Sequence, residues 1–384
     1  MTKGALFYHG TIYGHAGVHK EGWLLVERGH IADLGWDAPP PDVEARHIDL
    51  QGQSLVPGFI DLHAHGAVDC DTMDATPEAL RRMAGFYARH GVTAFLATTV
   101  SAPHQDTLAA LDNVARVARK GTDGAVLLGA HLEGPYLNAD RCGAQNRAHV
   151  RPPDSGEFAA FLATGIVRLV TLAPELPGSQ ALIALATEGD VTVALGHTRA
   201  DYETVCRAVD LGATQVSHLF NGMDPLHHRK PGAVCAALNL DALRCQVIAD
   251  GVHVHPVVLA LALRAKGAEH LILITDAMRG TGMPDGEYEL DGRDVTVCEG
   301  VARTQDGSLA GSTLTMERGL QNMMAAGDVD LSQALPMVTQ NPAQALKLKQ
   351  KGAIAMGKDA DLVVLDEAMN VTLTMVEGEI VHQL

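Results

Sequence analysis

The chain of 384 residues is poor in basic side chains, with 29 lysines and arginines against 46 aspartates and glutamates. The net charge of −17 would repel phosphate backbones and anionic membrane surfaces, and no concentrated basic patch offsets it. No apolar run approaches the roughly 18 residues that a membrane helix needs. Met1–Gly10 has no leader-like layout of charged and then apolar residues. These absences predict a cytoplasmic protein that binds neither nucleic acid nor membrane.

Disulfide and zinc-cluster spacings are also missing. The six cysteines are scattered and form no CxxC pair: Cys70, Cys142, Cys206, Cys235, Cys245 and Cys298. Such cysteines are typical of free thiols in a reducing compartment. Hydrophobic residues are abundant by contrast, at 47%, which is enough for a large core and excludes a disordered chain.

Short apolar runs alternate with amphipathic segments along the middle of the chain. The runs predict eight strands, at Leu55–Leu62, Thr93–Thr99, Val126–His131, Val167–Leu172, Val191–Leu195, Gln215–His218, Cys245–Ala249 and Leu271–Thr275. Helical patterns separate them, at Pro77–His90, Gln105–Lys120, Ser179–Glu188, Asp201–Leu211 and Pro256–Lys266. Continuous apolar strands between helices indicate a parallel sheet buried on both faces. Eight such units predict the α/β class and a (β/α)8 TIM barrel.

The two ends of the chain show short strands and turns instead. They lie at Trp23–Glu27, His30–Leu34, His47–Leu50, Leu362–Leu365, Val371–Met375 and Glu379–His382. Neither end alone buries enough surface to be stable, so we expect both to join in one small β-sandwich domain. The predicted domains are therefore 1–53 and 346–384 for the small domain and 54–345 for the barrel. A β-like excursion at Glu287–Gly311 interrupts the barrel.

Polar residues suited to metal binding stand where several predicted strands end. They are His63, His65, Glu133, His197, His218 and Asp276. Each has an ordinary structural explanation as a packed, turn or helix-capping residue. Their joint position is harder to explain that way, because the active site of a (β/α)8 barrel lies at the C-terminal ends of its strands. Imidazoles with a carboxylate are ligands for zinc, iron, cobalt or manganese.

The segment Pro57–Gly66 resembles the first-strand signature of the amidohydrolase superfamily. Further segments resemble, within it, the N-acetylglucosamine-6-phosphate deacetylase family: His131–Pro135, Gly196–Thr198, His218–Met223, Ala249–His253, Thr275–Met278 and Leu309–Ser312. The resemblance runs in register over about residues 50–345. It implies a metal-dependent enzyme of amino-sugar catabolism that removes the acetyl group of N-acetylglucosamine 6-phosphate.

The resemblance also implies roles for individual residues. Glu133, His197 and His218 would hold a primary divalent metal, most readily zinc or iron, and Asp276 would be the general acid and base. His63 and His65 would hold a second ion, so one or two metals per subunit are implied. The implied substrate contacts are Ala144, Gln145, Asn221, Gly222, Arg229, Asp250, His253, Leu309, Ala310 and Gly311. In that family the arginine equivalent to Arg229 reaches into the neighbouring subunit's site, so the resemblance implies a homodimer.

One position departs from the family pattern, and three alternatives follow from the residues. The family carries an Ala-His pair where this chain has Ala144-Gln145, and glutamine cannot carry a positive charge. The identity of the preferred sugar is therefore left open, and N-acetylgalactosamine-6-phosphate deacetylase is the close alternative. A cyclic-amide hydrolase or nucleobase deaminase would place a modified lysine after the fourth strand, where Ala173-Pro174-Glu175 stands. A non-enzymatic scaffold is expected to have lost ligands that this chain keeps.

Overall fold

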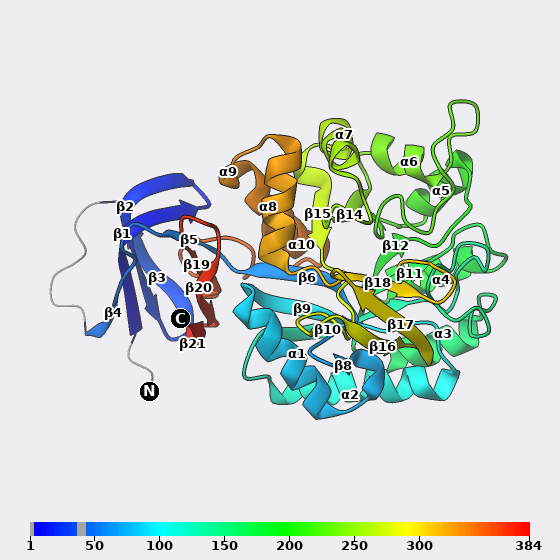
Figure 1. Ribbon diagram of the computed structural model, residues 1–384, viewed down its shortest axis with the longest axis horizontal. Helices are drawn as coiled ribbons and strands as arrows, with labels where there is room; N and C mark the ends of the chain where they lie inside the picture. The colour runs from blue at the N-terminus through cyan, green and yellow to red at the C-terminus, as the bar shows by residue number, and fades with distance from the viewer. Residues whose placement is uncertain (1–3, 37–43) are drawn as a thin grey trace.

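In the computed structural model, residues 4–36 and 44–384 are described. The larger part is a sheet of eight parallel strands paired in chain order. They are β6 (Phe59–Ala64), β9 (Val92–Thr98), β10 (Val126–Glu133), β11 (Val167–Leu172), β12 (Thr192–Leu195), β13 (Gln215–Val216), β14 (Arg244–Ile248) and β15 (Leu271–Ile274). The first and last strands meet where the Asp276 N–H donates to the His63 carbonyl oxygen at 2.8 Å. The expected barrel is confirmed (Figure 1).

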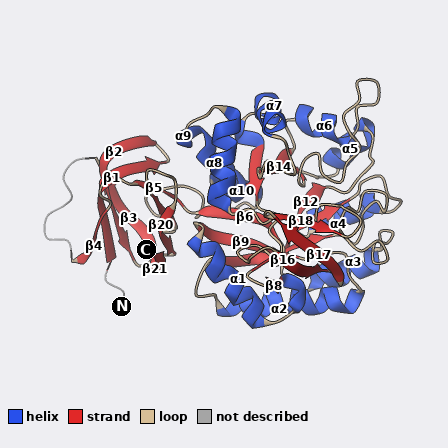
Figure 2. Ribbon diagram, viewed as in Figure 1, coloured by secondary structure: helices blue, strands red, loops and turns tan. Residues whose placement is uncertain are grey.

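Helices surround this sheet (Figure 2). They are α1 (Pro77–Arg89), α2 (His104–Lys120), α3 (Ser155–Ala163), α4 (Ser179–Glu188), α5 (Tyr202–Asp210), α6 (Ala233–Asn239), α7 (Pro256–Lys266), α8 (Met316–Gly327), α9 (Leu331–Ala334) and α10 (Gln340–Ala345). Gly121 and Gly267 follow α2 and α7 with positive φ, a backbone conformation that glycine adopts without strain. The sequence did not indicate α3 and α6, because both are short and largely apolar or small, with no clear polar face.

The apolar run Leu55–Leu62 is not one strand, as was predicted, but two. β5 (Ser54–Pro57) pairs with β1 and β19 in the sheet of the chain ends, whereas β6 begins the barrel. Gly58 stands at the crossing, where a Cβ atom would lie 2.1 Å from the Thr93 hydroxyl oxygen. Only glycine permits that approach, so the run divides there.

The second sheet contains strands from both ends of the chain, as expected for the small β domain (Figure 1). Its order is β21-β20-β19-β5-β1-β2-β3, with β4 on β1. The bounds are β1 (Gly4–Gly14), β2 (Gly17–Glu27), β3 (His30–Gly35), β4 (Ala45–Asp49), β19 (Leu362–Leu365), β20 (Val371–Val376) and β21 (Glu379–Gln383). Phe7, Leu24, Leu362 and Leu373 share its core. The predicted domain boundaries stay a prediction, and parts of the predicted segment 1–53, residues 1–3 and 37–43, lie outside the described residues.

The predicted β excursion is a three-stranded antiparallel sheet: β16 (Gly286–Leu290), β17 (Arg293–Cys298) and β18 (Val301–Thr304). Its buried side packs against Val100, Ala144 and Met278, which places it at the mouth of the barrel. Its edge and the following loop supply Leu290, Ser308 and Leu309 to the pocket there. Over the described ranges, no helix has the length and apolar character needed to cross a membrane.

Candidate active site

The six polar residues that end the predicted strands converge at one end of the barrel. Glu133 is the last residue of β10, while His65, His197, His218 and Asp276 stand just beyond β6, β12, β13 and β15. Three of these have positive backbone φ: 47° at His197, 28° at His218 and 51° at Asp276. Side chains other than glycine rarely adopt such angles, and strain of this kind clusters at functional sites.

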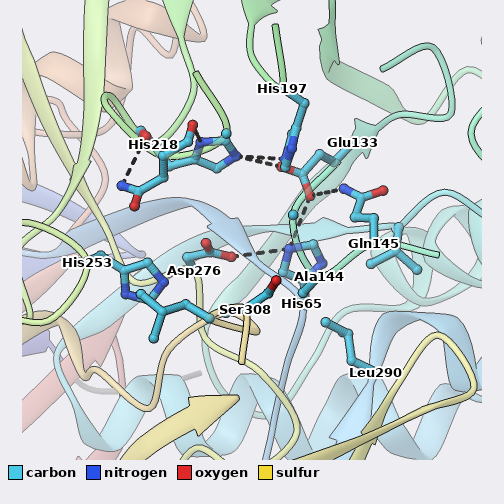
Figure 3. Close-up of a pocket in the computed structure, with 16 residues that line it drawn as sticks. His65, Glu133, Ala144, Gln145, His197, His218, His253, Asp276, Leu290 and Ser308 are labelled. Carbon is cyan, nitrogen blue, oxygen red and sulfur yellow. Dashed lines mark hydrogen bonds and ion pairs between the residues drawn. The ribbon is translucent and has the colours of Figure 1, made fainter. Parts of the chain in front are cut away.

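Glu133, His197 and His218 form a tight buried group (Figure 3). Glu133 Oε1 lies 3.2 Å from His197 Nε2 and 3.0 Å from His218 Nε2, and the two Nε2 atoms are 3.0 Å apart. Both rings turn their Nδ1 atoms toward backbone carbonyls, of Arg141 at 2.8 Å and of Asn221 at 3.2 Å. Because a carbonyl oxygen can only accept a hydrogen bond, each Nδ1 carries the ring proton. In a neutral imidazole the other nitrogen, Nε2, then has a free lone pair.

This arrangement fits a cation. Two imidazole lone pairs and a carboxylate oxygen face one point, and three acceptors repel one another unless a positive ion lies between them. Neutral imidazole nitrogens and a carboxylate oxygen are the ligands of zinc and related divalent ions, and the Nδ1 contacts are the outer hydrogen bonds that orient such ligands. The donor set therefore suits a divalent metal.

His63 and His65 form a second group with Glu133. Their Nε2 atoms are 3.3 Å apart and lie 3.4 Å from Oε1 and Oε2 of Glu133, respectively. Asp276 Oδ1 lies 3.2 Å from His65 Nε2 and 3.5 Å from His63 Nε2. Asp276 thus adjoins the two histidines of this second group and also lines the pocket, where a small molecule can reach it.

The electrostatics of the site keep its two acids ionised. Burial opposes the charge of Glu133, but the surrounding histidines, with the charge of His63 foremost, outweigh burial and hold the pKa of Glu133 well below its usual range. Burial likewise opposes the charge of Asp276, and His63 and His65 hold the pKa of Asp276 below its usual range. Since ionisation is maintained at neutral pH, the Asp276 carboxylate is available there as a proton acceptor.

Residues 54–381 match the amidohydrolase family. The chain belongs to the amidohydrolase family.

Within this family, the chain is similar to three deacetylases in particular. The chain is 38% identical over 372 residues to the N-acetylglucosamine-6-phosphate deacetylase of Lysinibacillus sphaericus, covering 96% of each. It is 37% identical over 364 residues to the N-acetylgalactosamine-6-phosphate deacetylase of Escherichia coli O157:H7, covering 94% of this chain and 96% of the other. Among solved structures, it resembles a variant N-acetyl-D-glucosamine-6-phosphate deacetylase of Mycobacterium smegmatis in complex with N-acetyl-D-glucosamine-6-phosphate. That likeness has a TM-score of 0.94 at 37% identity and covers 99% of this chain and 100% of the other.

Of the residues predicted to bind substrate in this amidohydrolase, some line the pocket and others do not. Those that line it are Ala144, Gln145, Asn221, Gly222, His253, Leu309 and Gly311. Asp250 does not line the pocket but accepts a hydrogen bond from His253 Nδ1 at 2.6 Å, which orients that ring. Ala310 is buried and donates its N–H to Ala302, while Arg229 belongs to the exposed stretch 225–231. Gly222 is required sterically, since a Cβ atom there would lie 2.9 Å from His197 Nδ1.

Sequence reasoning missed the polar layer beneath the amidohydrolase site. His131, on β10, lies with its ring centroid 4.5 Å from that of His63, and its Nε2 is 2.7 Å from the Thr171 hydroxyl. Burial, and then the charge of His63, hold the pKa of His131 well below its usual value. Gln246 Oε1 lies 3.3 Å from His63 Nδ1. The alternation of strand residues could have indicated His131, because it lies two positions before Glu133 and shares its face.

Proposed function

We propose that this protein is a metal-dependent deacetylase that hydrolyses N-acetylglucosamine 6-phosphate to glucosamine 6-phosphate and acetate. The proposal rests above all on the three facing acceptor atoms of Glu133, His197 and His218 with the Asp276 carboxylate in the same pocket. Relatives of that name, at 38% identity over nearly the whole chain, support the choice of substrate. The cavity, of about 290 Å³, suits a small ligand better than a polymer.

The side chains divide the work of the reaction. Glu133, His197 and His218 would hold a divalent cation, zinc or iron, and His63 and His65 would hold a second one with Glu133. When bound, such a cation supplies Lewis-acid chemistry, since it lowers the pKa of water toward neutrality and polarises a carbonyl group. The outer contacts of His197 and His218 keep both rings oriented for that task.

Asp276 moves the proton. Its carboxylate takes a proton from the attacking water as the water oxygen bonds to the acetyl carbon. The C–N bond then breaks, and Asp276 returns the proton to the sugar nitrogen, which cannot leave as an amide anion. Acetic acid and a free amine result, and at neutral pH the proton of the acid passes to the amine. The products are therefore acetate and an ammonium group, and atoms and charge balance.

A panel of N-acetylated hexosamines, with and without a 6-phosphate, tests the proposed substrate. We expect acetate release to be fastest with N-acetylglucosamine 6-phosphate and to fall when the phosphate is absent. N-acetylgalactosamine 6-phosphate, the C4 epimer, is the second candidate, because a relative of that name is 37% identical over 364 residues. Faster release from the galacto compound would reverse the assignment, and release from no member of the panel would refute it.

The phosphate needs a cation from outside this pocket. Among the described residues that line it, none is lysine or arginine, although the substrate would carry a dianion. Arg229 is exposed on the segment between β13 and α6. We therefore propose a homodimer in which Arg229 of one copy reaches the pocket of the other. Val257 and Leu261, on one face of α7, are 70% and 55% exposed. A contact between two copies could bury this apolar surface.

Replacing Arg229 by alanine is expected to lower kcat/KM for the phosphorylated sugar about ten- to a hundredfold. A hydrogen bond to a charged group contributes about 1.5–3 kcal/mol, which sets this range. The unphosphorylated sugar should be affected little, because it never engages the guanidinium group. Steady-state kinetics on both sugars measure the difference, and an equal loss on both would reject Arg229 as the phosphate contact.

Mixing Arg229→Ala with Asp276→Asn subunits tests whether the site is shared. After subunit exchange, a hybrid dimer has one pocket that combines an intact Asp276 with an intact Arg229 from the other copy. Activity on the phosphorylated sugar should therefore recover relative to either variant alone. If exchange is demonstrated and activity does not recover, Arg229 acts within its own subunit.

A further inference from the structure

Gln145 lies at the wall of the pocket, yet the protein itself engages both ends of its side-chain amide. Its Oε1 accepts hydrogen bonds from the Ser101 N–H at 2.8 Å and from the Ser101 hydroxyl at 2.5 Å. Its Nε2 donates to Glu133 Oε2 at 2.7 Å (Figure 3). The residue is only 4% exposed. Gln145 is therefore a buried link between Ser101 and the carboxylate of Glu133.

The direction of this link is determined by Ser101. A backbone N–H can only donate, so the amide oxygen of Gln145 must face it. A flipped amide would place NH2 against that N–H and its oxygen against the Glu133 carboxylate, which would replace attractive contacts by repulsive ones. The NH2 group consequently always points at Glu133.

The loop that carries Gln145 is held in place by the sheet at the barrel mouth. Arg293, on β17, donates from Nη1 to the Ala144 carbonyl oxygen at 2.8 Å, and its Nη2 pairs with Asp306 at 2.9 Å. The Gln145 N–H donates to the Cys142 carbonyl oxygen at 3.1 Å. The amide is thus positioned from both its backbone and its side chain.

We propose that Gln145 is a positioning residue that holds Glu133 in the orientation needed to bind a divalent metal. With Oε2 tied to Gln145, Oε1 is left facing His197 and His218 at 3.2 and 3.0 Å. Outer hydrogen bonds of this kind orient metal-binding carboxylates. The inference rests on the metal site of the proposed function, and it gives Gln145 a role beyond the substrate contact implied by family resemblance.

Gln145→Met tests this role, because methionine preserves the length of the side chain but has no amide. Protein loaded with Zn²⁺ is challenged with increasing concentrations of a chromophoric chelator, which reports the Zn²⁺ dissociation constant without any turnover. We expect binding about 10- to 100-fold weaker than in the wild type, the usual effect of removing an outer partner of a metal ligand. Circular dichroism should stay unchanged, while the Tm of the metal-free protein should fall modestly, because the buried Ser101 N–H loses its acceptor.

Two further variants should weaken Zn²⁺ binding to different degrees. Gln145→Asn keeps an amide but is one methylene shorter, so it cannot span from Ser101 to Glu133, and it should also weaken Zn²⁺ binding. Ser101→Ala removes the hydroxyl but keeps the backbone N–H that sets the direction of the amide, so its effect should be smaller than that of Gln145→Met.

The possible outcomes separate this inference from the proposed function. Wild-type Zn²⁺ affinity in both Gln145 variants, with only the KM for the sugar raised, would overturn the positioning role and leave a substrate contact. A wild-type protein that does not retain Zn²⁺ would instead overturn the metal site itself, and the inference with it. Weakened Zn²⁺ binding in both Gln145 variants, with the fold intact, would support the proposal.

Discussion

Replacing Asp276 by asparagine is expected to lower kcat by about 10²–10⁴-fold, the usual contribution of general acid–base catalysis. Asparagine has nearly the shape of aspartate but cannot take up and return a proton. The substitution keeps a polar group beside His65 and His63, which lie 3.2 and 3.5 Å from Asp276 Oδ1. Acetate release gives kcat, while circular dichroism and metal analysis should report an intact fold and a loaded site.

A matched control separates loss of the proton carrier from loss of one negative charge. Asp190→Asn makes the same chemical change in an exposed ion pair with Lys347, away from the pocket residues. Its kcat should equal that of the wild type. If Asp276→Asn also retained wild-type turnover, Asp276 would be removed from the mechanism.

Removing bound metal with a chelator is expected to abolish acetate release, and adding a divalent cation should restore it. The physical reason is the set of facing acceptors at Glu133, His197 and His218, whose ligand atoms all lie within 4.8 Å of one another. Without a cation these residues supply no electrophile, and neutral water attacks an amide very slowly. Metal analysis alongside the activity assay checks the result, and full activity in a demonstrably metal-free sample would contradict it.

Comparing variants of the two groups ranks them within the same experiment. His197→Ala should lose metal and activity together, because His197 belongs to the group with the closest contacts to Glu133. Replacing His63 and His65 together should be milder if they serve an auxiliary ion. Equal metal loss in both cases would show that the two groups are of equal importance.

Much of the barrel was predictable because its signals are local. Val167–Leu172 and Pro256–Lys266 have in the structure the bounds that their patterns indicate, since a buried strand and a glycine-terminated helix each show within a few residues. Of the two longest strands described in the small domain, β1 and β2, the first, at Gly4–Gly14, was missed. Its burial depends on β2, β4 and β5, which are partners that local sequence does not specify.

The order of residues was sufficient to place Glu133, His197, His218 and Asp276 at the ends of strands in a (β/α)8 barrel. That inference succeeds because parallel strands must present their C-terminal ends on one side. Tertiary structure alone decided how these side chains meet, through strained φ angles at three of them and backbone acceptors behind two rings. It also decided that Gln145 bonds to Ser101, 44 residues away in the chain, and to Glu133. Contacts between loops depend on how whole elements pack, and no periodicity of the sequence records them.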